Sequence, residues 1–157
     1  MILWIQRVIW RIVAPIATIA GARTVSAKAI VRRGDRRLLV RSPGGIWELP
    51  GGRPRDGELP EAALVREVEE ETGLRVQPGR LLTAELTRDS RGRWAPHVIL
   101  LVYEADLADA QAIRPPGLSR EHLAARWFSL DDLDRIDPAL VPGPTPALIR
   151  ASLARAS

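Results

Sequence analysis

The sequence predicts one mixed α/β domain that follows a short apolar helix. Three observations lead to this prediction. The chain has 157 residues, a length that suits a single domain with its own core. Several short apolar–polar runs of strand type are separated by turn residues. An acidic segment with helical start and stop signals follows a pair of glycines. We therefore divide the chain into an apolar extension, residues 1–22, and a domain, residues 23–157.

The composition narrows the class of protein. There is no cysteine, which excludes a disulfide framework and a Cys-ligated metal site. The net charge is +4, and the positive charge comes almost wholly from arginine, with Lys28 as the only lysine. Arginine suits bidentate recognition of phosphate, although a solvated surface explains the modest positive balance equally well. We expect a cytoplasmic protein that binds an anionic small molecule, and we expect no nucleic-acid partner.

The extension, residues 1–22, is mostly apolar. Arg7 and Arg11 interrupt its apolar run, which argues against a secretory signal and against a transmembrane helix. The pattern predicts a helix over residues 2–13 that ends near a proline. Packing against protein, including a homodimer contact, is the favoured role. Peripheral membrane contact through residues 1–20 is the alternative, because two tryptophans accompany the arginines.

The elements of the domain follow from hydrophobic periodicity and turn chemistry. Gly34-Asp35 joins two strand-like runs and predicts a hairpin. Ser129 suits the N-cap of a short helix, and Thr145 with Pro146 suits the start of a closing helix. We expect strands at 25–33, 36–42, 81–88, 97–105 and 125–129, and helices at 60–72, 130–136 and 147–156.

The helix at 60–72 carries an unusual concentration of negative charge. A proline at its start and a glycine after its end set its bounds. At ~100° per residue, Glu67, Glu70 and Glu71 share one face, while Glu69 points the opposite way into solvent. Three converging carboxylates are the hard oxygen ligands that Mg²⁺ or Mn²⁺ prefers. A solvated helix face paired with arginine is the alternative interpretation.

The spacing of residues around these glutamates resembles a known motif. It matches the Nudix box, the signature of the Nudix hydrolase family, at every defined position. With the preceding "IWELPGG" and the later "ARWFSLDDL", the resemblance spans roughly residues 24–135. The matching positions are Gly52, Glu58, Arg66, Glu67, Val68, Glu70, Glu71, Gly73 and Leu74.

The resemblance implies a fold, an activity and a set of site residues. Nudix enzymes are α/β/α sandwiches that cleave nucleoside diphosphates linked to another group, with Mg²⁺ or Mn²⁺ as cofactor. Arg66 would orient the glutamates by salt bridges, and Glu58 would support the loop or the metal site. The implied metal ligands are the backbone carbonyl of Gly52 and the carboxylates of Glu67, Glu70 and Glu71.

The general base has two candidates. A carboxylate must take the proton from the water that attacks phosphorus. Glu67 lies within the motif, and Glu121 lies six residues before Trp127. Many relatives also carry an acid three residues before that aromatic residue, where this chain has Ala124. The choice between Glu67 and Glu121 stays open on the sequence alone.

The sequence says less about the substrate. Arg41 and Arg53 are candidates for phosphate contacts, with solvated arginines as the alternative. Tyr103 lies in an apolar strand and is expected in the core. Residues 89–93 lack the proline typical of ADP-ribose enzymes and the tyrosine typical of dinucleoside polyphosphate enzymes, and the extended motif of NADH pyrophosphatases is missing. We expect a nucleotide-type diphosphate substrate. A non-catalytic nucleotide-sensing module is the alternative function.

Overall fold

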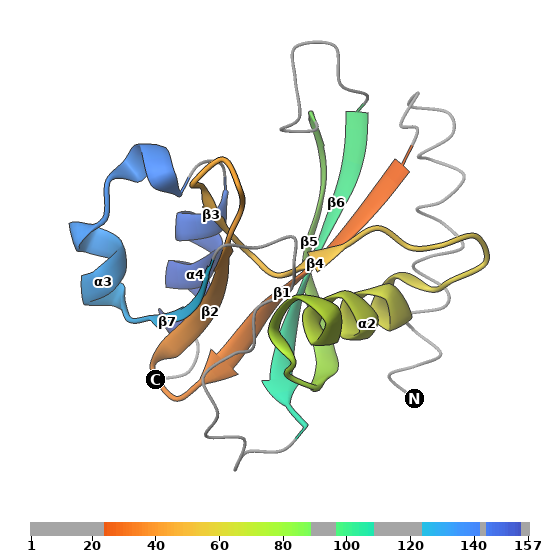
Figure 1. Ribbon diagram of the computed structural model, residues 1–157, viewed down its shortest axis with the longest axis horizontal. Coiled ribbons are helices and arrows are strands. Elements are labelled where there is room, and N and C mark those ends of the chain that lie inside the picture. The colour runs from red at the N-terminus through yellow and green to blue at the C-terminus, as the bar shows by residue number, and fades with distance from the viewer. Residues whose placement is uncertain (1–23, 89–96, 109–123, 142–143, 155–157) are drawn as a thin grey trace.

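The structure is a computed structural model that describes residues 24–88, 97–108, 124–141 and 144–154. Figure 1 shows these residues as one twisted sheet with helices beside it. The expected extension, the helix within it, and Glu121 lie outside the described residues.

Seven strands within the described residues form one mixed sheet. They are β1 (Thr24–Arg33), β2 (Arg36–Arg41), β3 (Trp47–Glu48), β4 (Gly51–Gly52), β5 (Val76–Arg88), β6 (His97–Leu107) and β7 (Ala124–Phe128). Five of them follow the order β3-β2-β1-β6-β5, while β4 pairs with β1 and β7 pairs with β2. β1 and β6 run parallel, and the other pairs are antiparallel. The predicted mixed α/β class is confirmed.

The predicted hairpin is present between β1 and β2. Arg33 faces Arg36 across a turn formed by Gly34 and Asp35. Gly34 has φ +57°, a left-handed conformation that glycine adopts without steric cost. The turn therefore sets the register of both strands, as the sequence predicted.

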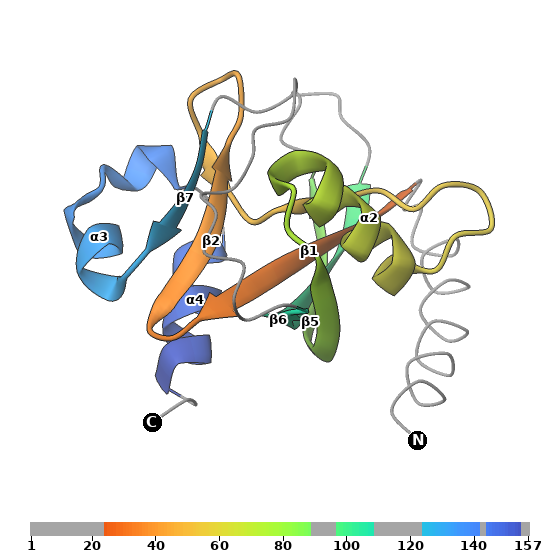
Figure 2. The ribbon, with the colours of Figure 1, turned by 60° about the horizontal axis from the view of Figure 1, so that its bottom comes forward.

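Helices cover both faces of the sheet. α2 (Pro60–Thr72) packs on one face, and α4 (Thr145–Ala154) packs on the other, so that β1 lies between them (Figure 2). α3 (Leu130–Arg135) and a 3₁₀ turn, η1 (Pro138–Leu140), link β7 to α4. This arrangement is the layered architecture that the sequence analysis expected.

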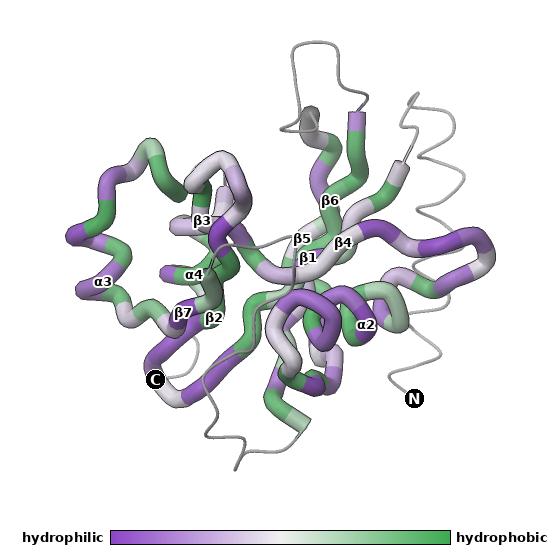
Figure 3. Tube along the Cα trace, viewed as in Figure 1, coloured by the Kyte–Doolittle hydropathy of each residue, from purple (hydrophilic) through white to green (hydrophobic). Residues whose placement is uncertain are grey.

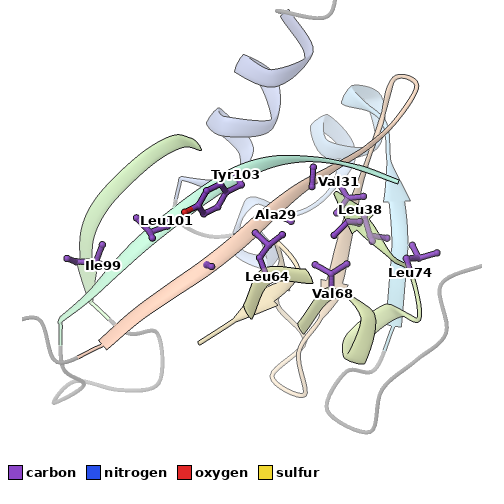
Figure 4. Close-up of a cluster of buried hydrophobic side chains, with 12 residues drawn as sticks. Ala29, Val31, Leu38, Leu64, Val68, Leu74, Ile99, Leu101 and Tyr103 are labelled. Carbon is purple, nitrogen blue, oxygen red and sulfur yellow. The ribbon is translucent and has the colours of Figure 1, made fainter. Parts of the chain in front are cut away.

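Each face of the sheet has its own apolar core. Alternate residues of β1 contribute side chains to the two cores, because successive side chains of a strand point to opposite faces. On the α2 face, Leu64 and Val68 are fully buried against Ala29 and Leu101 (Figure 4). On the α4 face, Ile149 packs with the side chains Ile30, Leu39, Val102 and Phe128. The first of these cores fixes α2 against the sheet.

The helix α2 has the bounds that the sequence predicted. Pro60 occupies its first turn, where the missing N–H costs nothing. Gly73 follows its last residue with φ +69°, and its N–H donates to the Glu69 carbonyl at 2.8 Å. The helix therefore begins and ends by local chemistry, and its apolar stripe then sets its rotation.

Several elements differ from the predicted bounds. β5 begins at Val76 rather than residue 81, and the extra residues include register shifts around Pro78 and Leu81. A proline and a glycine hid this part of the strand, because both are typical of turns. β3 and β4 are only two residues long and were not predicted. The closing helix includes Thr145, which was expected to precede it.

None of the helices in the part of the chain that the structure describes is long and apolar enough to cross a membrane.

Candidate active site

At the candidate site, the short strand β4 pairs with β1. Gly51 lies opposite Lys28, and Gly52 lies opposite Ala27. Gly51 has φ +123°, and a Cβ added to it would lie 2.3 Å from the Ala27 carbonyl oxygen. Only glycine allows this close approach, which brings both backbone units of β4 against β1.

This close approach gives a stability prediction. We expect Gly51→Ala to lower the free energy of unfolding by about 3–5 kcal/mol, because backbone strain adds to a steric overlap. Gly57→Ala is the matched control, since Gly57 also has positive φ (+76°) but nothing lies within 4 Å of an added Cβ. It should cost only about 1 kcal/mol. Urea unfolding of the two variants measures the difference, and equal losses would contradict the role of the overlap.

Glu67 directs its carboxylate at the backbone of Gly52. A Cβ placed on Gly52 would lie 2.5 Å from the Glu67 carboxyl carbon and 2.7 and 2.8 Å from its oxygens. The carboxylate thus fills the space that a side chain at position 52 would need. The sequence predicted these two groups together in one site, and the structure places them in contact.

Glu71 is the most deeply buried of the four crowded glutamates. Only 7% of the residue is exposed, and its Oε2 accepts a hydrogen bond from the Gly51 N–H at 2.8 Å. Burial raises the pKa of Glu71 to about 7, against the opposing effects of Lys28 and the Gly51 N–H. A buried carboxylate held beside the backbone of β4 is poised to gain a cation, since a positive charge would offset its desolvation.

Arg66 organises the carboxylates around it. Its Nε and Nη2 donate to the two oxygens of Glu58 at 2.9 and 2.8 Å, which is a bidentate pair. Its Nη1 donates to Glu67 at 2.6 Å and to Glu70 at 3.4 Å, and its Nη2 also donates to the Arg53 carbonyl at 3.1 Å. One guanidinium therefore connects the loop after β4 to the helix α2.

Glu58 holds the loop that leads into α2. This loop is mostly hydrophilic (Figure 3). Glu58 accepts a hydrogen bond from the Arg55 N–H at 2.8 Å in addition to the two from Arg66. The hydrogen bonds from Arg66, followed by that from Arg55, lower the pKa of Glu58 to about 2. The loop conformation is thus fixed by charge.

Glu70 and Glu69 are both exposed but differ in their contacts. Glu70 lies between two arginines, accepting from Arg55 Nη2 at 3.3 Å and from Arg66 Nη1 at 3.4 Å. Glu69 is exposed, as predicted, but Glu70 is exposed too, so exposure does not distinguish the two predicted helix faces. As the side chains stand, the described residues contain no group of three His, Asp or Glu side chains that could hold a metal ion.

The donor set nevertheless fits a divalent cation. The Glu67 carboxylate contacts the backbone of Gly52, because glycine has no side chain to block it. The Glu71 carboxylate is held by its hydrogen bond from the N–H of the neighbouring Gly51. Two carboxylates and a backbone carbonyl are hard oxygen ligands of the kind that Mg²⁺ and Mn²⁺ prefer. Glu70 would have to leave its arginines to join them. The residues present therefore suit the metal that the sequence analysis expected.

The structure also describes the contacts of Arg41, Arg53 and Tyr103, which the sequence analysis singled out. Arg41 is the last residue of β2, where its Nε donates to the Gly45 carbonyl at 3.2 Å and its guanidinium lies 6.0 Å from the Trp47 ring centroid. Arg53 follows β4 directly and meets Arg66 through its carbonyl. Tyr103 is 3% exposed and donates to Glu61 at 3.0 Å, so the prediction that it lies in the core is confirmed.

The sequence analysis missed Lys28 and Arg55 as parts of this neighbourhood. Lys28 comes from the middle of β1, and its Nζ donates to the Gly51 carbonyl at 2.5 Å. Its status as the only lysine was visible in the sequence, but its pairing with Gly51 depends on strand register. Arg55 lies within the matched motif at a position that the motif leaves undefined.

Comparison of the sequence with known proteins gives the same family that the site residues indicate. The sequence matches the NUDIX domain family over residues 22–148. It is 35% identical over 123 residues to a MutT-like protein of Streptomyces ambofaciens, covering 74% of this chain and 71% of that protein. It is also 35% identical to an NAD-capped RNA hydrolase, NudC, of Stutzerimonas stutzeri, but this match covers 66% of the chain and only 36% of NudC.

A solved structure supports the same assignment. An ADP-ribose pyrophosphatase of Streptococcus suis has a TM-score of 0.61 and 26% identity, over 82% of this chain and 91% of that one. The family match covers most of the chain and includes the glycines, Arg66 and the glutamates described above. The chain belongs to the Nudix hydrolase family.

Proposed function

We propose that this protein is a metal-dependent pyrophosphohydrolase that cleaves a nucleoside diphosphate linked to another group by attack of water on phosphorus. The observation that carries the proposal is the position of two carboxylates on the two glycines of β4. Glu67 lies against Gly52, and the buried Glu71 accepts from the Gly51 N–H. Two carboxylates gathered at a backbone that only glycine permits suit a divalent cation, which would offset the desolvation of Glu71.

Each residue has a proposed role in this chemistry. The Gly52 carbonyl, Glu67, Glu70 and Glu71 would hold Mg²⁺ or Mn²⁺. The metal, when bound, would neutralise diphosphate oxygens and make water a better nucleophile. Arg66 would offset the repulsion between the carboxylates and hold them in position by its hydrogen bonds. Arg41 and Arg53 would contact phosphate oxygens.

The proton of the attacking water would go to a carboxylate. Glu67 is our first candidate for this base, because it faces the glycine backbone on which the reacting group would lie. Glu121, outside the described residues, is the second candidate. Glu121→Gln should lower kcat less than tenfold if Glu67 is the base, since a true general base contributes roughly a hundredfold or more.

The relatives suggest which substrates to test. One similar protein is an NAD-capped RNA hydrolase, and another is an ADP-ribose pyrophosphatase. The substrate named for each of them contains a nucleoside diphosphate unit. We propose a nucleotide-type small molecule as substrate and the cytoplasm as the place of action. We also propose that residues 1–22 serve a protein contact.

A hydrolysis screen in which the monophosphate products are separated by chromatography tests the proposed function. The panel comprises nucleoside diphosphates and triphosphates, sugar nucleotides, ADP-ribose, NAD, NAD-capped RNA and CoA, each with Mg²⁺, Mn²⁺ or EDTA. We expect turnover of at least one compound with metal and none with EDTA, because the site is built from hard oxygen donors. Glu71→Gln is the inactive control. No turnover over the whole panel, together with nucleotide binding, would favour the sensing module instead.

A further inference from the structure

Lys28 is the feature of this site that the family motif does not explain. It is the only lysine in a chain whose positive charge is otherwise carried by arginine. Its side chain is 18% exposed, so its ammonium group is largely shielded from water. It extends from the middle of β1, next to the two glycines of β4.

The surroundings of Lys28 are acidic. Its Nζ donates to the Gly51 carbonyl at 2.5 Å and lies 3.9 Å from Glu48 Oε2. Its charge also favours the ionised form of Glu71. In the part of the chain that the structure describes, the Gly51 carbonyl is the acceptor of its hydrogen bond. Lys28 thus places its positive charge near the carboxylates of Glu48 and Glu71.

The position of Lys28 relative to the proposed metal ligands is fixed by strand pairing. Gly51 and Gly52 are neighbours in β4, and residues of a strand rise by about 3.3 Å each. The ammonium on Gly51 therefore lies one residue from the backbone unit that faces Glu67. A phosphate group held near Glu67 and Glu71 would come within reach of the flexible lysine side chain.

We propose that Lys28 is a phosphate-binding residue of the active site, which neutralises the acidic corner before ligand binds and then donates to an oxygen of the substrate's diphosphate. This inference rests on the proposed hydrolase function. An ammonium is a compact point charge with three donors on a four-carbon stem, so it can exchange the Gly51 carbonyl for a phosphate oxygen. Once a divalent cation satisfies Glu67 and Glu71, the diphosphate and Glu48 would be the anions beside Lys28.

The first test uses binding instead of turnover. Calorimetric titration with methylenediphosphonate in the presence of Mg²⁺ should show that Lys28→Gln binds this probe roughly ten- to a hundredfold more weakly than the parent, because a charge-assisted hydrogen bond is lost. Lys28→Arg should recover part of the affinity. Mn²⁺ binding, followed by electron paramagnetic resonance without the probe, should be no weaker in Lys28→Gln than in the parent. Thermal melting checks that both variants fold.

The second test needs no substitution. Because Lys28 is the only lysine, reductive methylation with ¹³C-formaldehyde labels only Lys28 and the chain's amino terminus. We expect the Lys28 methyl resonance to shift when methylenediphosphonate is added with Mg²⁺, and to broaden when Mn²⁺ replaces Mg²⁺. A resonance that stays unchanged with bound probe would overturn the proposal.

The outcomes separate this inference from the proposed function. If the parent and Lys28→Gln bind the probe equally, Lys28 does not contact phosphate, while the hydrolase function stands. If Lys28→Gln also loses Mn²⁺ binding, Lys28 supports the acidic site and the phosphate role is wrong. If the parent binds neither Mn²⁺ nor the probe and hydrolyses nothing, the proposed function fails and the inference fails with it.

Discussion

Glu67→Gln and Glu71→Gln are each expected to lower kcat by a hundredfold or more, while Glu69→Gln keeps activity within about threefold of the parent. Each of the first two removes a negative charge next to the backbone of β4, where the metal is proposed to bind. Glu69 is exposed, and helical periodicity turns it away from Glu67 and Glu71. Steady-state kinetics at several Mg²⁺ concentrations measures the effect.

Glu70→Gln completes this series. Glu70 lies on Arg55 and Arg66 in the structure, so it must move to become a ligand. We expect Glu70→Gln to lose metal affinity and most activity, as proposed for a ligand. Activity close to that of Glu69→Gln would show that Glu70 stays with its arginines during the reaction. Damage from Glu69→Gln equal to that from Glu71→Gln would contradict the division of the helix into two faces.

The same series has a signature in stability. The folded-state pKa of Glu71 is raised to about 7 from its ordinary value of 4.5. A carboxyl with a raised pKa must ionise against burial as the pH rises, so the parent should lose stability between about pH 4.5 and pH 7. Glu71→Gln removes that loss and keeps the acceptor for the Gly51 N–H. At pH 8 without metal its Tm should exceed that of the parent by a few degrees, whereas Mg²⁺ should raise only the parent's Tm.

Arg66→Met should produce the second large effect, lowering the free energy of unfolding by about 2–4 kcal/mol and activity by about a hundredfold. The Arg66 side chain is 17% exposed and contacts the Glu58, Glu67 and Glu70 carboxylates. Without it, these carboxylates would repel one another, and the Arg53 carbonyl would lose the hydrogen bond from Nη2. We expect both the conformation of the loop after β4 and the orientation of the Glu67 carboxylate to become less well defined.

Arg66→Lys is the matched control for this variant. Lysine keeps the positive charge but cannot form the bidentate pair with Glu58 and reach Glu67 at the same time. We expect it to restore about half of the lost stability and less than half of the lost activity on a logarithmic scale. Denaturant unfolding and kcat measurements on the three proteins decide this. Full recovery by lysine would mean that charge alone matters, and that the fork geometry does not.

Much of the candidate site was predictable because it is local in sequence. The ends of α2 depend on Pro60 and Gly73, and the turn between β1 and β2 depends on Gly34. The separation of Glu69 from Glu67 depends only on helical periodicity. The family follows from the spacing of a few residues in the same segment, and the NUDIX domain match confirms it.

The tertiary structure decided how these local pieces meet. The parallel pairing of β1 with β6 joins segments that are far apart in the chain, and the pairing of Lys28 with Gly51 depends on register. The burial of Glu71 likewise results from packing α2 on the sheet. Turns and helix ends are stabilised by hydrogen bonds within a few residues, so the sequence alone determined them. Strand partners and burial depend on contacts between distant residues, so only the folded chain determined which charges lie around the two glycines.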